Sequence, residues 1–140
     1  MNTMKEANMR PSMYRNNVNK YAAVQNEAAL EDASPHKLIQ MLMSGFLMRV
    51  NAAKGAIDRG DFEGKSEQIS KAIAIVGGLT DGLNAEEGGE IAENLSNLYS
   101  YINNRLFQAS SENDIAILDE VAGLMRELKE AWDAIPERYL

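Results

Sequence analysis

The chain contains no cysteine, so disulfide bonds and metal sites built on thiolates are excluded. Its only histidine is His36, which rules out the paired Glu-x-x-His motifs that hold a di-iron centre in helical bundles. No window approaches the ~18 apolar residues that a membrane span requires. The N-terminal residues 1–17 lack the apolar stretch of a secretory signal. We therefore expect a soluble cytoplasmic protein without membrane insertion, metal or cofactor.

The charge is acidic and unevenly distributed. The net charge is −7, whereas residues 1–30 hold four basic and two acidic side chains, a balance of +2 that leaves −9 on the rest. Phosphate backbones are bound by basic patches. The acidic body therefore argues against nucleic acid as a partner, and solubility alone is sufficient to explain it.

Prolines are few, and their positions outline the fold. Only Pro11, Pro35 and Pro136 occur, and no alternating apolar and polar run indicates a strand. We expect an all-α protein, an antiparallel four-helix bundle over residues 33–140. Residues 1–32 are expected to form a flexible or loosely docked N-terminal arm.

The first helix is predicted to begin at Ser34-Pro35, because serine caps a free backbone N–H and proline already has helical φ. It runs to about Ile57, and breaks are expected at 58–61, 84–89 and 109–113. Between and after these breaks, apolar residues recur three and four apart. The predicted core stripes hold Ile69, Ala72, Ile73, Val76, Leu79 and Leu83; Ile91, Leu95, Leu98, Ile102 and Leu106; and Leu118, Val121, Ala122, Met125, Leu128, Trp132 and Ile135.

Five apolar side chains fall outside these stripes at 100° per residue: Met41, Met48, Ile75, Tyr101 and Phe107. Scattered apolar side chains are normal on protein surfaces. Methionine is nevertheless common at adaptable binding surfaces. We therefore take these five as candidates for outer grooves that receive apolar segments of a partner protein.

The residues that could carry chemistry have structural explanations. His36 lies in the first helical turn and is expected to be structural. The carboxylates of Glu86, Glu87, Glu90 and Glu93 would oppose the positive end of a helix dipole, although a divalent cation is an alternative. Gly88-Gly89 is interpreted as a turn. Gly77-Gly78 lies inside a helix, where a close neighbouring helix, a hinge or a partner contact could each explain it.

Several segments of the chain resemble one family. Ala33 to Ile39 with Met41-Leu42 and Gly45 resembles the opening of the first bundle helix in the FliS-type flagellin chaperones. Later matches, in the family's order and spacing, are Lys71-Ala72, Gly88 to Ala92, Asn94-Leu95, Leu98-Tyr99, Tyr101, Arg105-Leu106, Leu118 to Val121 and Ala131-Trp132.

The resemblance implies a chaperone without catalytic activity. Its members bind the disordered C-terminal segment of flagellin in the cytoplasm, prevent premature polymerisation and deliver the subunit to the cytoplasmic domain of the flagellar export gate. Val18 and Tyr21 match the family's apolar motif before the bundle, which implies a role in covering the binding surface or docking at the gate. Seating of the arm on the bundle is the alternative for these two residues.

A second function class is kept open. Surplus apolar surface could equally make the chain a structural helical module that associates with itself, and a homodimer is possible on either interpretation. A tightly dimeric chain indifferent to flagellin would favour this alternative.

Overall fold

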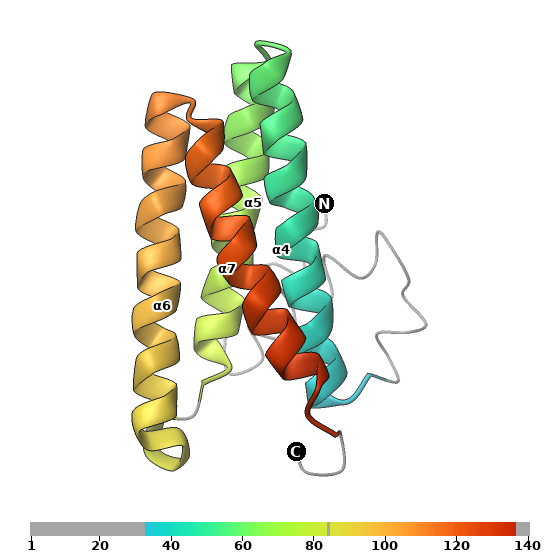
Figure 1. The fold of residues 1–140 in the computed structure, drawn as a ribbon, viewed down its shortest axis with the longest axis vertical. Helices are drawn as coiled ribbons and strands as arrows, with labels where there is room; N and C mark the ends of the chain where they lie inside the picture. The colour runs from blue at the N-terminus through green and yellow to red at the C-terminus, as the bar shows by residue number, and fades with distance from the viewer. Residues whose placement is uncertain (1–32, 84, 137–140) are drawn as a thin grey trace, which may run out of the picture.

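The computed structural model describes residues 33–83 and 85–136, which form four helices. They are α4 (Pro35–Asp58), α5 (Phe62–Asp81), α6 (Ala85–Glu112) and α7 (Ile115–Asp133). Each helix runs antiparallel to the next, and contacts join α4 to α5, α5 to α6, α6 to α7 and α7 back to α4 (Figure 1). The predicted all-α, antiparallel four-helix bundle is confirmed. Val18 and Tyr21 lie outside the described residues.

Local capping explains where three of the helices begin. The Ser34 hydroxyl accepts a hydrogen bond from the Lys37 backbone N–H at 3.1 Å, with Pro35 in the first turn, as predicted. The Asp61 carboxylate accepts from the Gly64 N–H, and the Asp114 carboxylate from the Ala116 N–H, both at 2.9 Å. These caps satisfy N–H groups that have no partner within the helix.

The core is mainly aliphatic and draws on all four helices. Its buried residues are Leu38, Leu42, Met43, Phe46, Val50 and Ala53 of α4; Ile69, Ala72, Ile75, Val76 and Leu79 of α5; Tyr99, Ile102, Leu106 and Ala109 of α6; and Ile117, Leu118, Val121, Ala122 and Met125 of α7. These residues supply most of the hydrophobic free energy that holds the bundle together.

Ile75 corrects one prediction. It was expected outside the core, but only 1% of it is exposed. A Cβ placed on Gly45 of α4 would lie 3.4 Å from the Ile75 side chain, so Ile75 packs against α4 where that helix has no side chain of its own. Because α5 lies between α4 and α6, it buries an arc wider than the single stripe that the spacing indicated.

The breaks between helices are shorter than predicted. The third helix starts at Ala85, and the expected turn at Gly88-Gly89 is a kink within α6, where Gly89 has φ 55° and ψ −126°. α6 then continues to Glu112, so Ala109 is a buried helical residue, and the connection to α7 turns at Asn113 with φ 53°. Positive φ suits glycine and is tolerated by asparagine.

The two adjacent glycines of α5 have different surroundings. Gly78 is buried, whereas a Cβ added to Gly77 would meet no atom within 4 Å. A closely approaching neighbouring helix therefore does not explain Gly77. Its presence lowers helix stability by about 1 kcal/mol relative to alanine, and the bundle gains no packing in return.

A pair of reciprocal contacts joins the start of α4 to the end of α7. His36 is buried, its ring stacks on Trp132 with centroids 5.1 Å apart, and its Nε2 lies 2.9 Å from the Trp132 carbonyl oxygen. In return, Trp132 Nε1 donates to the His36 carbonyl at 3.0 Å. A carbonyl only accepts, so His36 Nε2 carries the proton. We call this pair the His36–Trp132 clasp, and it confirms a structural role for His36.

Further polar contacts fix both ends of the bundle. Beside the clasp, Gln40 Nε2 donates to the Asp133 carboxylate at 2.7 Å, and Lys129 pairs with the same carboxylate. At the opposite end, the buried Lys65 donates to the Ser110 carbonyl at 2.8 Å and so joins α5 to the last turns of α6. The α4–α7 and α5–α6 pairs are thus each anchored at a defined point.

Within the described part of the chain, no helix has the length and apolar character needed to span a bilayer. The same residues contain no group of three or more histidine or acidic side chains placed to hold a metal ion.

Candidate functional site

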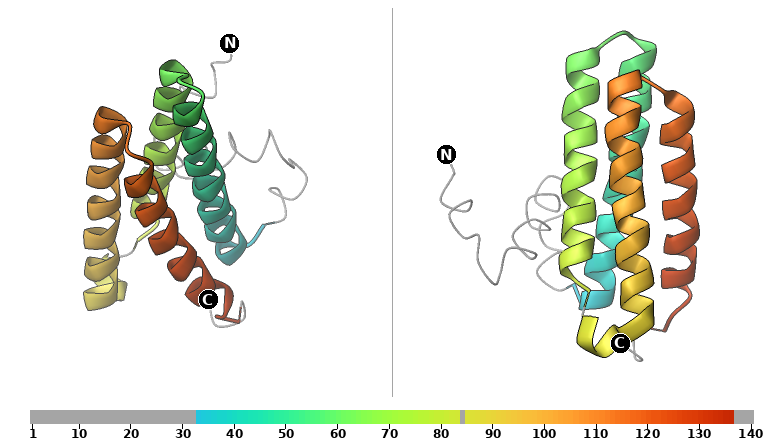
Figure 2. Two further views of the ribbon diagram at one scale, coloured as in Figure 1. Left: turned by 45° about the horizontal axis from the view of Figure 1, so that its top comes forward. Right: turned by 90° about the vertical axis from the view of Figure 1, so that its left-hand side faces the viewer.

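The C-terminal half of α7 leaves α6 and leans toward α4. Figure 1 and the left-hand view of Figure 2 both show α7 crossing toward the start of α4 while α6 stays upright. The His36–Trp132 clasp holds α7 in that position. The N-terminal half of α6, at the bottom of Figure 1, is therefore covered less by α7 than it would be if the two helices stayed side by side along their whole length.

Two rows of apolar side chains follow the facing edges of α6 and α7. The row on α6 has members three or four residues apart, namely Ile91, Leu95, Leu98 and Tyr101. The row on α7 has Leu124 and Leu128, which follow Glu120 at intervals of four. The four leucines are half-buried against the core, and Ile91 is 72% exposed. We call these six apolar residues, with Glu120, the α6–α7 strip.

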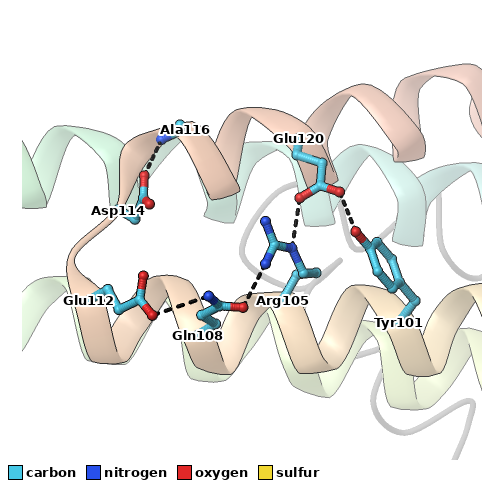
Figure 3. A network of polar contacts seen from close by, with 7 residues as sticks. All are labelled: Tyr101, Arg105, Gln108, Glu112, Asp114, Ala116 and Glu120. Carbon is cyan, nitrogen blue, oxygen red and sulfur yellow. Dashed lines mark hydrogen bonds and ion pairs between the residues drawn. The ribbon is translucent and has the colours of Figure 1, made fainter.

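A polar network closes the upper end of the strip. The Tyr101 hydroxyl donates to one oxygen of Glu120 at 2.5 Å, and Arg105 Nε donates to the other at 2.8 Å (Figure 3). Arg105 also donates to Gln108, which in turn donates to Glu112. The network spans α6 and α7 and fixes the direction of the Tyr101 ring, of which 44% is exposed. A fixed, partly exposed tyrosine beside arginine is typical of residues that dominate protein interfaces.

The network also shifts the titration of its members. The hydrogen bond from Tyr101, followed by that from Arg105, lowers the pKa of Glu120. The hydrogen bond to Glu120 raises the pKa of Tyr101 and also that of Arg105. Both effects have one cause, because these hydrogen bonds favour the ionised carboxylate and the protonated donors.

Glu120 gives a direct test of this geometry. In Tyr101→Phe the strongest donor to Glu120 is lost, and we expect the pKa of Glu120 to rise toward its ordinary value while staying lowered by Arg105. A carboxyl-detected NMR titration of both proteins measures the change. Asp133, whose pKa is lowered mainly by its bond with Lys129, serves as the internal control and should titrate identically in both. An unchanged Glu120 titration would show that the Tyr101 hydrogen bond does not persist in solution.

The five candidate surface residues do not gather at one place. Tyr101 belongs to the α6–α7 strip. Phe107 is 60% exposed. It follows Ser96 by eleven residues, which is about three helical turns, so the two residues lie on the same side of α6. Ser96 lines a pocket with residues of α5, and this side of α6 therefore faces α5. Met48 is 54% exposed on α4, whereas Met41 is half-buried and packs against the core. Ile75 is internal, as described above.

Two exposed apolar residues were missed. Ile91 has the spacing of the core stripe and was predicted to be buried, which is wrong because α7 diverges from α6 at its level. Phe62 is half exposed at the first position of α5, where its ring lies 5.6 Å from the Lys65 ammonium. The exposure of Ile91 depends on how helices distant in the chain are placed, which a single helix pattern does not contain.

The fold and the strip define a class of protein. A small helical bundle with a well-packed core and a partly exposed apolar row, ended by a fixed tyrosine, is suited to binding a segment of another protein.

Comparison with known proteins identifies the family. The family described as "Flagellar protein FliS" matches residues 17–139. The flagellar secretion chaperone FliSB of Pseudomonas aeruginosa is 48% identical over 115 residues, which cover 82% of this chain and 91% of the relative. The flagellar secretion chaperone FliS of Vibrio cholerae is 41% identical over 125 residues, 89% of this chain and 92% of the relative. FliS of Salmonella typhimurium is 47% identical over 116 residues, 82% and 86% of the two chains. The chain belongs to the FliS family of flagellar secretion chaperones.

Proposed function

We propose that this chain is a flagellin export chaperone. It binds the disordered C-terminal segment of flagellin in the cytoplasm, keeps that segment from polymerising, and delivers the subunit to the cytoplasmic domain of the flagellar export gate. The names of the relatives, flagellar secretion chaperones, support a client destined for the flagellum. The observation that carries the binding step is the α6–α7 strip.

The strip suits a segment that folds as it binds. An amphipathic helix laid along α6 and α7 would cover Ile91 and Tyr101 and complete the burial of the four half-buried leucines. Ordering a disordered segment offsets part of the free energy gained from this burial, so binding stays reversible over a large contact area. Reversibility allows the client to be released for export.

The remaining candidate residues extend this proposal. Met41, Met48 and Phe107 lie on other faces of the bundle and would serve a long client that wraps around it. Val18 and Tyr21 of the arm are proposed to cover the binding surface or to contact the export gate. Self-association through the same strip is the competing function and would bury the same residues.

Calorimetry with flagellin tests the proposal. We expect saturable binding of full-length flagellin, and loss of that binding when the flagellin lacks its C-terminal segment. Sedimentation of the chaperone alone provides the control for self-association. A chain that dimerises tightly and ignores full-length flagellin would instead be a self-associating helical module.

A further inference from the structure

The edge of α6 opposite the α6–α7 strip borders a pocket. Thr80 and Leu83 from the end of α5 and Gly89, Ala92, Glu93, Ser96 and Asn97 from the start of α6 line it. α5 and α6 run side by side there (right-hand view of Figure 2). Ala92 and Glu93 directly follow Ile91 of the strip. The pocket and the strip therefore flank the same end of one helix.

The segment of the sequence that contributes this pocket carries only acidic charges. Between Lys71 and Arg105 the sequence has no lysine, arginine or histidine, and it holds Asp81, Glu86, Glu87, Glu90 and Glu93. Asp81 occupies the last position of α5, where the negative end of the helix dipole repels a carboxylate. Among the described residues, no cation pairs with the exposed Asp81, Glu90 or Glu93. Within the described part of the chain, these three carboxylates are thus not neutralised by an ion pair.

Gly77 extends the same surface along α5. It precedes Thr80 by one turn, and the space where its side chain would stand is open. A glycine there lowers helix stability without serving any contact within the bundle. Space left above a bare helix backbone allows another chain to approach closely.

We propose that this α5–α6 pocket binds a positively charged stretch of the client, continuous with the part that lies on the α6–α7 strip. A lysine or arginine fits the lining, because its aliphatic stem can lie on Leu83 and Ala92 while its charged end meets Glu93. The exposed Asp81 directly follows the lining residue Thr80 and adds negative charge beside the pocket. Gly77 then accommodates the client's backbone or a large side chain. The inference rests on the proposed binding of flagellin.

A pair of matched glycine substitutions tests the role of Gly77. Gly123 of α7 also lies within a helix and has no atom within 4 Å of an added Cβ. Gly77→Gln and Gly123→Gln should both raise the melting temperature, since each replaces a helix-interior glycine by a better helix former. Gly77→Gln should weaken flagellin binding about tenfold, and Gly123→Gln should leave it unchanged. A gain in stability with a loss of affinity cannot come from unfolding.

Charge substitutions test the chemistry independently. Asp81→Asn with Glu93→Gln should weaken flagellin binding about tenfold at low salt and flatten its salt dependence. The control, Asp58→Asn with Glu130→Gln, removes the same amount of charge from exposed sites on α4 and α7. It should change neither the affinity for flagellin nor its salt dependence.

The outcomes separate the inference from the proposed function. If wild-type protein binds flagellin and the Gly77 and charge variants bind equally well, the pocket is not a client site although the chaperone function stands. If wild-type protein does not bind flagellin, both fail. If Gly77→Gln changes only self-association in sedimentation, the pocket receives a second copy of this chain and the inference is wrong.

Discussion

Replacing Trp132 by alanine is expected to lower the free energy of unfolding by about 3 kcal/mol, the lower end of the range for removing a large buried aromatic side chain. Trp132 is only partly buried, but three contacts join it to His36, two of them made by its side chain and one by its backbone carbonyl. These are the ring stacking, the Nε1 bond to the His36 carbonyl, and the bond between His36 Nε2 and the Trp132 carbonyl. The alanine variant also leaves the His36 ring against a cavity.

The conservative variant Trp132→Phe separates stacking from hydrogen bonding. Phenylalanine keeps an aromatic ring beside His36 and loses only the indole N–H, so we expect a loss of about 1 kcal/mol. Urea denaturation followed by far-ultraviolet circular dichroism measures both variants. Equal losses for phenylalanine and alanine would mean that the hydrogen bond, and not the stacked ring, holds the clasp together.

We expect the clasp to affect client binding as well, because it holds the end of α7 against α4. Without it, the C-terminal half of α7 is free to settle on α6 and cover Leu95 and Leu98, which are half-buried in the structure. A variant that remains folded at low temperature should then bind flagellin more weakly, even though neither His36 nor Trp132 belongs to the α6–α7 strip. His36 and Trp132 would thus act as positioning residues for the binding surface.

The fold was predictable because its signals are local. The Ser34-Pro35 start depends on residues within one turn of each other, and the helical spacing of apolar residues depends on one helix at a time. The errors share a different origin. Ile75 is buried because α5 packs between two neighbours, and Ile91 is exposed because α7 leans away from α6. Both depend on helices that are distant in the sequence.

The candidate site was predictable in part for the same reason. Tyr101 was singled out because it lies outside the stripe of its own helix. Its bond to Glu120, nineteen residues later, requires the relative placement of α6 and α7. The clasp joins residues 96 positions apart, and nothing near His36 in the sequence indicates Trp132 as its partner. Gly77 was noticed as unusual, but only the space around it excludes the packing explanation.

The partial exposure of the α6–α7 strip follows from the contacts at the two ends of α7. At its first turns the Tyr101–Glu120–Arg105 network holds α7 to α6, and at its last turn the clasp holds it to α4. Lys54 of α4 also pairs with Asp119 at 2.6 Å, so the first turns of α7 are held to both neighbours, whereas its last turn is held to α4. Between these points α7 leans away from α6 and toward α4 (Figure 1). The apolar rows between the two anchors therefore remain partly uncovered.

Replacing Ile91 and Tyr101 together by serine is expected to weaken flagellin binding about 100-fold, since the loss of two contacts of roughly 1.4 kcal/mol each corresponds to that factor. These are the two most exposed members of the α6–α7 strip, so the bundle loses little packing when they are shortened. The Tyr101–Glu120 bond is lost as well, but it lies at the surface, where hydrogen bonds contribute little to stability. The melting temperature should accordingly change by only a few degrees.

Phe62→Ser is the control. Phe62 is 51% exposed, similar to Tyr101, lies at the start of α5 away from the strip, and is not among the proposed client contacts. Calorimetry of both variants with full-length flagellin should show the large loss only when Ile91 and Tyr101 are replaced. Any exposed apolar residue would contribute equally to non-specific adhesion. Equal losses of affinity in the two variants would therefore contradict a client bound along α6 and α7, and would favour a client spread over the whole bundle.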